Sequence, residues 1–275
     1  MNISFCNTEY LSEGEYYLVS GDWSALAEQS SQITLVGLPH LTGSFVADSS
    51  GLKLTLTSNA DSLTWNGEDA ESKWSETWFG SSDAAANMTG TMVFDDSASF
   101  TEVSVTTAQN VEKMVFNASE KDYALDATTH AVTAEYLYQF GSQSTTLLGD
   151  VNVTNATTIA KGELVVTKAV EKDANGAYLS GQELGTISGE GTLTIDWGAK
   201  NSAALDITHI GTLNLKSGTY ELNAADTENG GTKLINKAIV GANATLKMAN
   251  GVTLNSDLEW AGTIAAEQAT LNGKI

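Results

Sequence analysis

The chain has 275 residues, enough to bury a sizeable core without disulfides or a structural metal. Its 34 acidic and 13 basic residues give a formal net charge of −21, so phosphate backbones are repelled and we expect no nucleic-acid partner. All 13 basic residues are lysine, and without the arginine fork a nucleotide enzyme is disfavoured. Charged residues make up 17% of the chain, whereas about 25% is typical of globular domains. The difference is filled by Thr, Ser, Asn, Ala and Gly, which suit strands and tight turns.

The cysteine content and the N-terminus limit the chemistry and the targeting. Cys6 is the single cysteine, so an intramolecular disulfide and a multi-cysteine metal site are excluded. The segment from Met1 to Tyr17 is too polar for a signal peptide, and no apolar run approaches the roughly 18 residues of a membrane span. We therefore expect no membrane insertion by this chain, and we expect any export signal to lie outside the given sequence.

Strand patterns dominate the chain. Helical periodicity is confined to residues 24–29 and 83–87, which are too short for more than a helical turn. Pro39 is the single proline, and this scarcity favours continuous backbone pairing, because proline lacks the N–H donor. Four segments alternate apolar with polar residues, the period of a half-buried strand. They are 52–57, 102–106, 151–154 and 212–216.

From about Gly162 short strand-like units repeat, each followed by Asn, Gly, Asp or Ser. The step from Leu193 to Leu213 is 20 residues, and later steps are irregular. One unit cannot enclose a core, so each must bury its apolar face against the next, which predicts a β-solenoid of parallel coils. Asparagines at the strand edges either stack between coils or accommodate left-handed turns. These are Asn214, Asn223, Asn255 and Asn272.

The segment from Leu63 to Leu125 carries a family resemblance. It contains Trp-Asn-Gly, a lone Trp, Trp-Phe-Gly, Val-Phe-Asp-Asp, an alternating strand, Val-Phe-Asn and Tyr-Ala-Leu, in that order. This order resembles the passenger-associated β-repeats of bacterial autotransporter-type surface proteins. The resemblance implies a parallel β-helix at the extracellular side or outer surface of a bacterium. An export signal and a C-terminal translocator barrel are both missing from the sequence, so it looks like a passenger segment or a secreted relative.

These patterns divide the chain into three segments. Residues 1–62 form an N-terminal β-strand segment, 63–125 a Trp-containing passenger-type repeat, and 126–275 the solenoid strand repeats. The predicted fold class is all-β, a parallel β-helix or β-solenoid with a Trp-containing inserted segment.

Two groups of residues are candidates for a site. Asp95 and Asp96 are adjacent carboxylates, but neighbouring strand residues face apart, so we favour a strand-ending turn over a catalytic pair. Trp65, Trp74 and Trp78 either stack on sugar rings in a ligand-binding cleft or plug the core. We favour the plug, because surfaces rarely expose several large aromatic side chains.

The sequence contains no recognisable catalytic, metal or cofactor motif. His40, His130 and His209 lie far apart and have no nucleophile motif near them. The metalloprotease, dinucleotide and calcium-repeat patterns do not occur, so we expect no metal and no cofactor. Carboxylates are the plentiful reactive groups, so an enzyme of this sequence would be a carboxylate-dependent hydrolase.

The resulting prediction is an extracellular or cell-surface passenger with a structural or adhesive role. It would present a long acidic face to a host glycoprotein, glycan or matrix partner. The alternative is a secreted hydrolase, an acid peptidase or a glycan-cleaving enzyme, acting on mucin-type glycoprotein. A third possibility is a spacer in a longer chain. The hydrolase requires Asp95 or Asp96 to meet a second carboxylate and a Trp in one concave groove.

Overall fold

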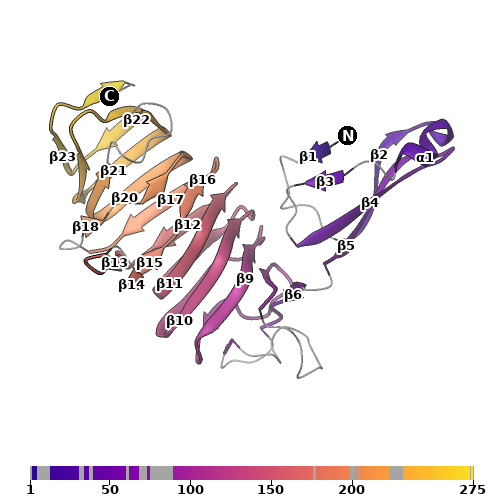
Figure 1. Cartoon of the computed structure of the whole chain (residues 1–275), viewed down its shortest axis with the longest axis horizontal. Helices are drawn as coiled ribbons and strands as arrows, with labels where there is room; N and C mark the ends of the chain where they lie inside the picture. The colour runs from indigo at the N-terminus through magenta and orange to yellow at the C-terminus, as the bar shows by residue number, and fades with distance from the viewer. Residues whose placement is uncertain are drawn as a thin grey trace.

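Strands make up most of the structure, and the main body is a parallel β-solenoid of about seven turns. The computed structural model describes residues 2–4, 13–30, 34–36, 40–59, 62–67, 73–74, 89–175, 178–198, 202–203, 205–222, 232–272 and 274. Of the described residues, 66% lie in strands and 2% in α-helix, which confirms the expected fold class. Figure 1 shows the solenoid strands stacked from β6 to the C-terminus, with the smaller N-terminal sheet beside the β6 end of the stack.

An antiparallel three-stranded sheet precedes the solenoid. Across the sheet, the order is β2 (Gly14–Ser20), β5 (Gly51–Ser58) and β4 (Leu41–Ala47). Leu52, Leu54 and Leu56 are buried on one face of β5, as their alternation with polar residues predicts. Phe45 of β4 belongs to the same buried cluster. This sheet therefore has its own small core.

Short elements precede and connect the strands of this sheet. The helical turn expected at 24–29 forms a 3-10 turn, η2 (Ser24–Leu26), followed by α1 (Ala27–Ser30). β1 (Asn2–Ser4) pairs in parallel with β3 (Thr34–Val36). The turn expected at 83–87 lies outside the described residues, as do Cys6 and Pro39.

The solenoid begins at β6 (Ser62–Thr64), which pairs in parallel with β7 (Thr91–Phe94). Strand β10 pairs with β8 through its first half and with β9 through its second half, so it turns a corner of the coil. It also runs through position 125, so the stack continues between the second and third predicted segments. The other strands are β8 (Glu102–Ser104), β9 (Gln109–Phe116), β10 (Tyr123–Gln139), β11 (Ser144–Ile159), β12 (Glu163–Val166), β15 (Gln182–Glu183), β16 (Thr186–Ser188), β17 (Thr192–Asp196), β18 (Ser202–Ala203), β19 (Asp206–Ile207), β20 (His209–Leu222), β21 (Thr232–Met248), β22 (Thr253–Trp260), β23 (Thr263–Ala266) and β24 (Thr270–Asn272).

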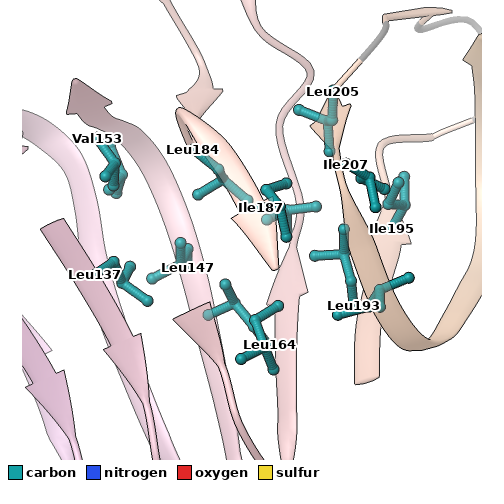
Figure 2. Packing of buried hydrophobic residues seen from close by; sticks show 14 of the residues in the cluster. Leu137, Leu147, Val153, Leu164, Leu184, Ile187, Leu193, Ile195, Leu205 and Ile207 are labelled. Carbon is teal, nitrogen blue, oxygen red and sulfur yellow. The ribbon is translucent and has the colours of Figure 1, made fainter. Parts of the chain in front are cut away.

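Aligned apolar side chains hold successive coils together. One column, which we call the apolar column, runs through eight strands in direct register. Its first seven members are at most 1% exposed, and each contributes about 1.5–3 kcal/mol by burial. Figure 2 shows side chains of this and neighbouring columns gathered between the coils. The column consists of Val103, Leu125, Leu147, Val166, Ile195, Leu215, Val240 and Trp260.

The irregular repeat length has a structural cause. Leu193 pairs with Leu213, at the 20-residue step seen in the sequence. Leu164 pairs with Leu193, a longer step, because an antiparallel hairpin of β13 (Glu171–Lys172) and β14 (Tyr178–Ser180) lies between them. Gly211 marks a close approach of coils, since an added Cβ would lie 1.9 Å from the Glu190 carbonyl oxygen.

The edge asparagines stack between coils. Asn272 Nδ2 donates a hydrogen bond of 2.9 Å to Asn255 Oδ1, and Asn214 Nδ2 donates one of 3.2 Å to Thr194 Oγ1. None of these three asparagines has a positive φ, so the stacking interpretation applies to them. Asn223 lies outside the described residues.

Candidate functional site

Two of the predicted tryptophans lie in the core of the first coils. Trp65 is 0% exposed and Trp74 is 1% exposed. The Trp74 ring centroid lies 5.5 Å from that of Phe94, which in turn stacks on Phe116 at 4.6 Å. The Trp65 indole donates to the Phe100 carbonyl at 2.8 Å. This burial agrees with the plug interpretation and leaves neither ring face open to a sugar.

The other tryptophans lie elsewhere: Trp23 packs against the core of the N-terminal sheet, and Trp197 lies further along the same solenoid core as Trp65 and Trp74. Trp78 lies outside the described residues. Trp197 is 3% exposed and packs near Tyr220, whereas Trp260 is 50% exposed at the last coil. The aromatic cleft considered from the sequence is therefore not assembled by Trp65 and Trp74.

Asp95 and Asp96 occupy a turn directly after β7, and their carboxylates bind different partners. Asp95 Oδ1 accepts hydrogen bonds from the amide and the hydroxyl of Ser97, at 2.9 and 2.5 Å. Asp96 accepts from the amide and hydroxyl of Ser119, both at 2.8 Å, and from the Glu120 amide at 2.9 Å. Burial raises the pKa of Asp96, but these hydrogen bonds outweigh it and hold the pKa below the ordinary value. Asp96 therefore ties one coil to the next.

Asp95 instead lines a pocket that the sequence did not reveal. The pocket has a volume of about 240 Å³ and lies where the N-terminal sheet meets the first coils. Two carboxylates, an imidazole, an amide and three hydroxyls line it, together with two aliphatic side chains. The lining residues, which we call the junction pocket, are Glu13, His40, Leu41, Ser58, Ser62, Thr64, Val93, Asp95 and Asn117.

His40 is the most enclosed polar residue of the junction pocket. Its side chain is 6% exposed, and burial lowers the pKa of His40 to about 4, although the Asp95 charge acts in the opposite direction. The imidazole is therefore neutral at pH 7. Its Nδ1 atom is buried and has no hydrogen-bond partner among the described residues. Such an atom is an incomplete interaction within the site.

The two carboxylates of the pocket are anchored differently. Glu13 Oε1 accepts a hydrogen bond of 2.7 Å from the Ser58 amide, and hydrogen bonds from Ser58 lower the pKa of Glu13. Asp95 is held by its own turn, as described above. Asn117 adds a buried side-chain oxygen without a hydrogen-bond partner in the described part of the chain. No lysine is among the described residues that line the pocket. The pocket is therefore polar and negatively charged.

A row of aromatic side chains begins at the wall of the junction pocket. The Phe140 ring lies 6.4 Å from the His40 ring, and Phe140 packs in a cluster with Val93. Tyr138 lies 5.3 Å from Phe140, and Tyr136 stacks on Tyr138 at 6.2 Å with an interplanar angle of 23°. Both tyrosines are half-buried, so part of each ring faces solvent. We call Tyr136, Tyr138 and Phe140 the aromatic row.

The other histidines lie away from the junction pocket. His209 Nε2 lies 2.6 Å from Glu190 Oε1 on the solenoid surface. His130 is exposed on β10. Within the described ranges, no group of three or more His, Cys, Asp or Glu side chains is arranged to hold a metal ion. No helix among the described residues is long and apolar enough to cross a membrane.

Sequence reasoning missed the site that the fold assembles. The alternation Tyr136, Tyr138, Phe140 places all three rings on one side of β10 and its extension, and this period-two signal was available in the sequence. Glu13 and His40 had no such local signal.

No family model matches the chain, and neither a curated protein nor a solved structure matches it.

Proposed function

We propose that this chain is a rigid β-solenoid passenger at the extracellular side or outer surface of a bacterium. Its role is structural or adhesive, toward a host glycoprotein or matrix partner. The observation that carries the proposal is the apolar column, which continues in register through eight strands. A stack in which each coil contacts its neighbours is an extended scaffold with a long lateral surface, which suits display and binding.

Surface charge supports a neutral or basic partner. Among the residues that the structure describes, at least six lysines form ion pairs with carboxylates, so much of the positive charge is locally neutralised, although each exposed pair adds little stability. With 34 acidic residues in the whole chain, the excess surface charge is negative. The pairs are Lys53–Asp48, Lys113–Glu112, Lys168–Asp150, Lys172–Glu183, Lys237–Glu259 and Lys247–Glu221.

A carboxylate-dependent hydrolase is the second candidate, and one observation favours it. Asp95 shares the junction pocket with Glu13 and with the neutral imidazole of His40. Carboxyl groups that share a concave site can act as acid and base when one of them holds a proton. Trp65 and Trp74 take no part, because both are buried.

Binding and cleavage assays on one preparation separate the two candidates. The full chain is applied to immobilised mucin, to an extracellular-matrix preparation and to a bare surface, and soluble products are measured from pH 4 to 8. We expect saturable binding to mucin or matrix without release of fragments. Fragment release with an acidic optimum, abolished by Asp95→Asn, would establish the hydrolase instead. Absence of binding to every surface would reject the adhesive role.

Location is tested separately. Antibodies against the solenoid should label intact cells of the producing bacterium, and external protease should remove that label. Label that appears only after the cells are lysed would contradict the surface assignment.

A further inference from the structure

We propose that the junction pocket and the aromatic row form one binding site for an uncharged saccharide. The pocket takes one sugar ring, and Tyr138 and Tyr136 support the following part of the glycan. This assignment rests on the proposed adhesive function and gives it a location and a ligand class.

The two parts of the site are contiguous. Val93 lines the junction pocket and also packs with Phe140, the first ring of the aromatic row. The His40 ring lies 6.4 Å from Phe140, so the pocket wall passes directly into the row. Ring centroids along the row are 5.3 and 6.2 Å apart, and because Phe140 is 5% exposed, Tyr138 and Tyr136 provide the part of the row that a ligand can reach.

The polar groups of the pocket match sugar hydroxyls. A hydroxyl both donates and accepts, so it can donate to Asp95 or Glu13 and accept from the side chains of Ser62 or Thr64. His40 is 6% exposed and its Nδ1 has no partner among the described residues, and the Asn117 side-chain oxygen is in the same state. Buried polar atoms of this kind are normally satisfied, so these two leave hydrogen-bonding capacity unused in the residues that line the pocket.

The apolar part of the site matches the carbon-bound face of a sugar. Leu41 and Val93 provide an aliphatic wall, and Tyr138 and Tyr136 offer partly exposed rings for stacking. The polar pocket and the adjoining apolar surface together offer a sugar both hydrogen-bonding groups and a stacking face.

Charge sets the specificity. Glu13 and Asp95 bring two acidic side chains to the pocket, and no lysine is among the described lining residues. A sialic acid, a uronic acid or a sulfated sugar would therefore be repelled, both locally and by the net charge of −21. The ligand class that remains is a neutral hexose or an N-acetylhexosamine.

The test measures binding of defined sugars to the full chain. Neutral hexoses, N-acetylhexosamines and their disaccharides are titrated by nuclear magnetic resonance and calorimetry, next to sialylated and sulfated counterparts. We expect binding of at least one neutral sugar, and at least tenfold weaker binding of its acidic counterpart. Equal or tighter binding of the acidic sugar overturns the proposal. So does a preference for glucosamine over N-acetylglucosamine, because that would indicate a cation site.

Variants locate the binding. Tyr138→Ala and Asp95→Asn should each weaken neutral-sugar binding at least tenfold. The matched control for Asp95→Asn is Asp126→Asn, because Asp126 binds the Thr128 amide and hydroxyl in the same turn geometry away from the pocket. The control for Tyr138→Ala is Trp260→Ala, which removes an exposed aromatic at the opposite end of the solenoid. Asp95→Asn is nearly isosteric, so it keeps the test valid if Tyr138→Ala fails to fold.

The outcomes distinguish the site from the function. If the wild-type chain adheres to mucin or matrix and both site variants adhere equally well, the adhesive function stands and the site assignment is wrong. If soluble sugar binds and both site variants lose it, but no glycoprotein or matrix is bound, the site stands and the adhesive role is wrong. Equal loss in the control variants also overturns the site.

Discussion

Acid should weaken the fold through His40, and the variant His40→Gln should remove this effect. The folded-state pKa is about 4 and the ordinary value is 6.5, so the unfolded chain binds more protons between these two pH values. Stability from this group is therefore fully present above pH 6.5 and is lost as the pH falls toward 4. The difference of about 2.5 pH units at about 1.36 kcal/mol per unit corresponds to roughly 3 kcal/mol.

The assay is urea denaturation followed by tryptophan fluorescence at several pH values from 7 to 4. Other carboxylates with lowered pKa values, including Asp48 and Asp96, also destabilise the fold in acid, but they do so equally in both proteins. The informative quantity is the difference in free energy of unfolding between wild type and His40→Gln. As the pH falls from 7 to 4, the wild type should lose about 3 kcal/mol more free energy of unfolding than His40→Gln loses. His209→Gln is the control, because His209 is half-buried on the solenoid surface beside Glu190, whereas His40 is enclosed. A difference that stays constant with pH would refute the assignment of a buried, neutral His40.

Three further variants, with Asp95→Asn for comparison, test the core, the turn and the coil spacing by the same denaturation assay. Trp74→Ala should cost about 3–5 kcal/mol, because Trp74 is 1% exposed among aromatic rings, and an unchanged free energy of unfolding would show that the ring is not a plug. Asp96→Asn should cost about 1 kcal/mol, because its carboxylate joins two coils, whereas Asp95→Asn should cost less. Gly211→Ala should cost about 1–3 kcal/mol, because its Cβ would lie 1.9 Å from a carbonyl oxygen of the preceding coil, and a neutral effect would contradict that close approach.

The solenoid could be predicted because its order is local and repeated. Alternating residues mark single strands, and the 20-residue step from Leu193 to Leu213 reappears as a direct register pair. Strand lengths could not be predicted in the same way. β10 has 17 residues and turns from β8 to β9 with a register shift between Ala127 and Val132, and no proline or glycine marks that corner. Strand ends are predicted from residues that interrupt the alternating pattern, such as proline and glycine. At this corner the chain bends without such a residue.

The junction pocket was beyond sequence reasoning for a different reason. His40 and Asp95 are separated by more than 50 residues, and no periodicity relates a residue before β4 to one after β7. Their proximity depends on how the N-terminal sheet docks on the first coils. The aromatic row could have been found, because Tyr136, Tyr138 and Phe140 alternate on one strand direction.

The position of the pocket follows from the architecture. Within a solenoid each coil repeats its neighbour, so lateral surfaces tend to be ridged rather than concave, and a pocket needs an element that interrupts the repeat. Here the N-terminal sheet and its flanks supply Glu13, His40, Leu41 and Ser58, while Ser62, Thr64, Val93, Asp95 and Asn117 come from the coils. Neither part holds the whole lining. Binding at the junction would therefore depend on the N-terminal sheet staying docked on the coils. Acid that protonates His40 would weaken this docking, and ligand binding would weaken with it.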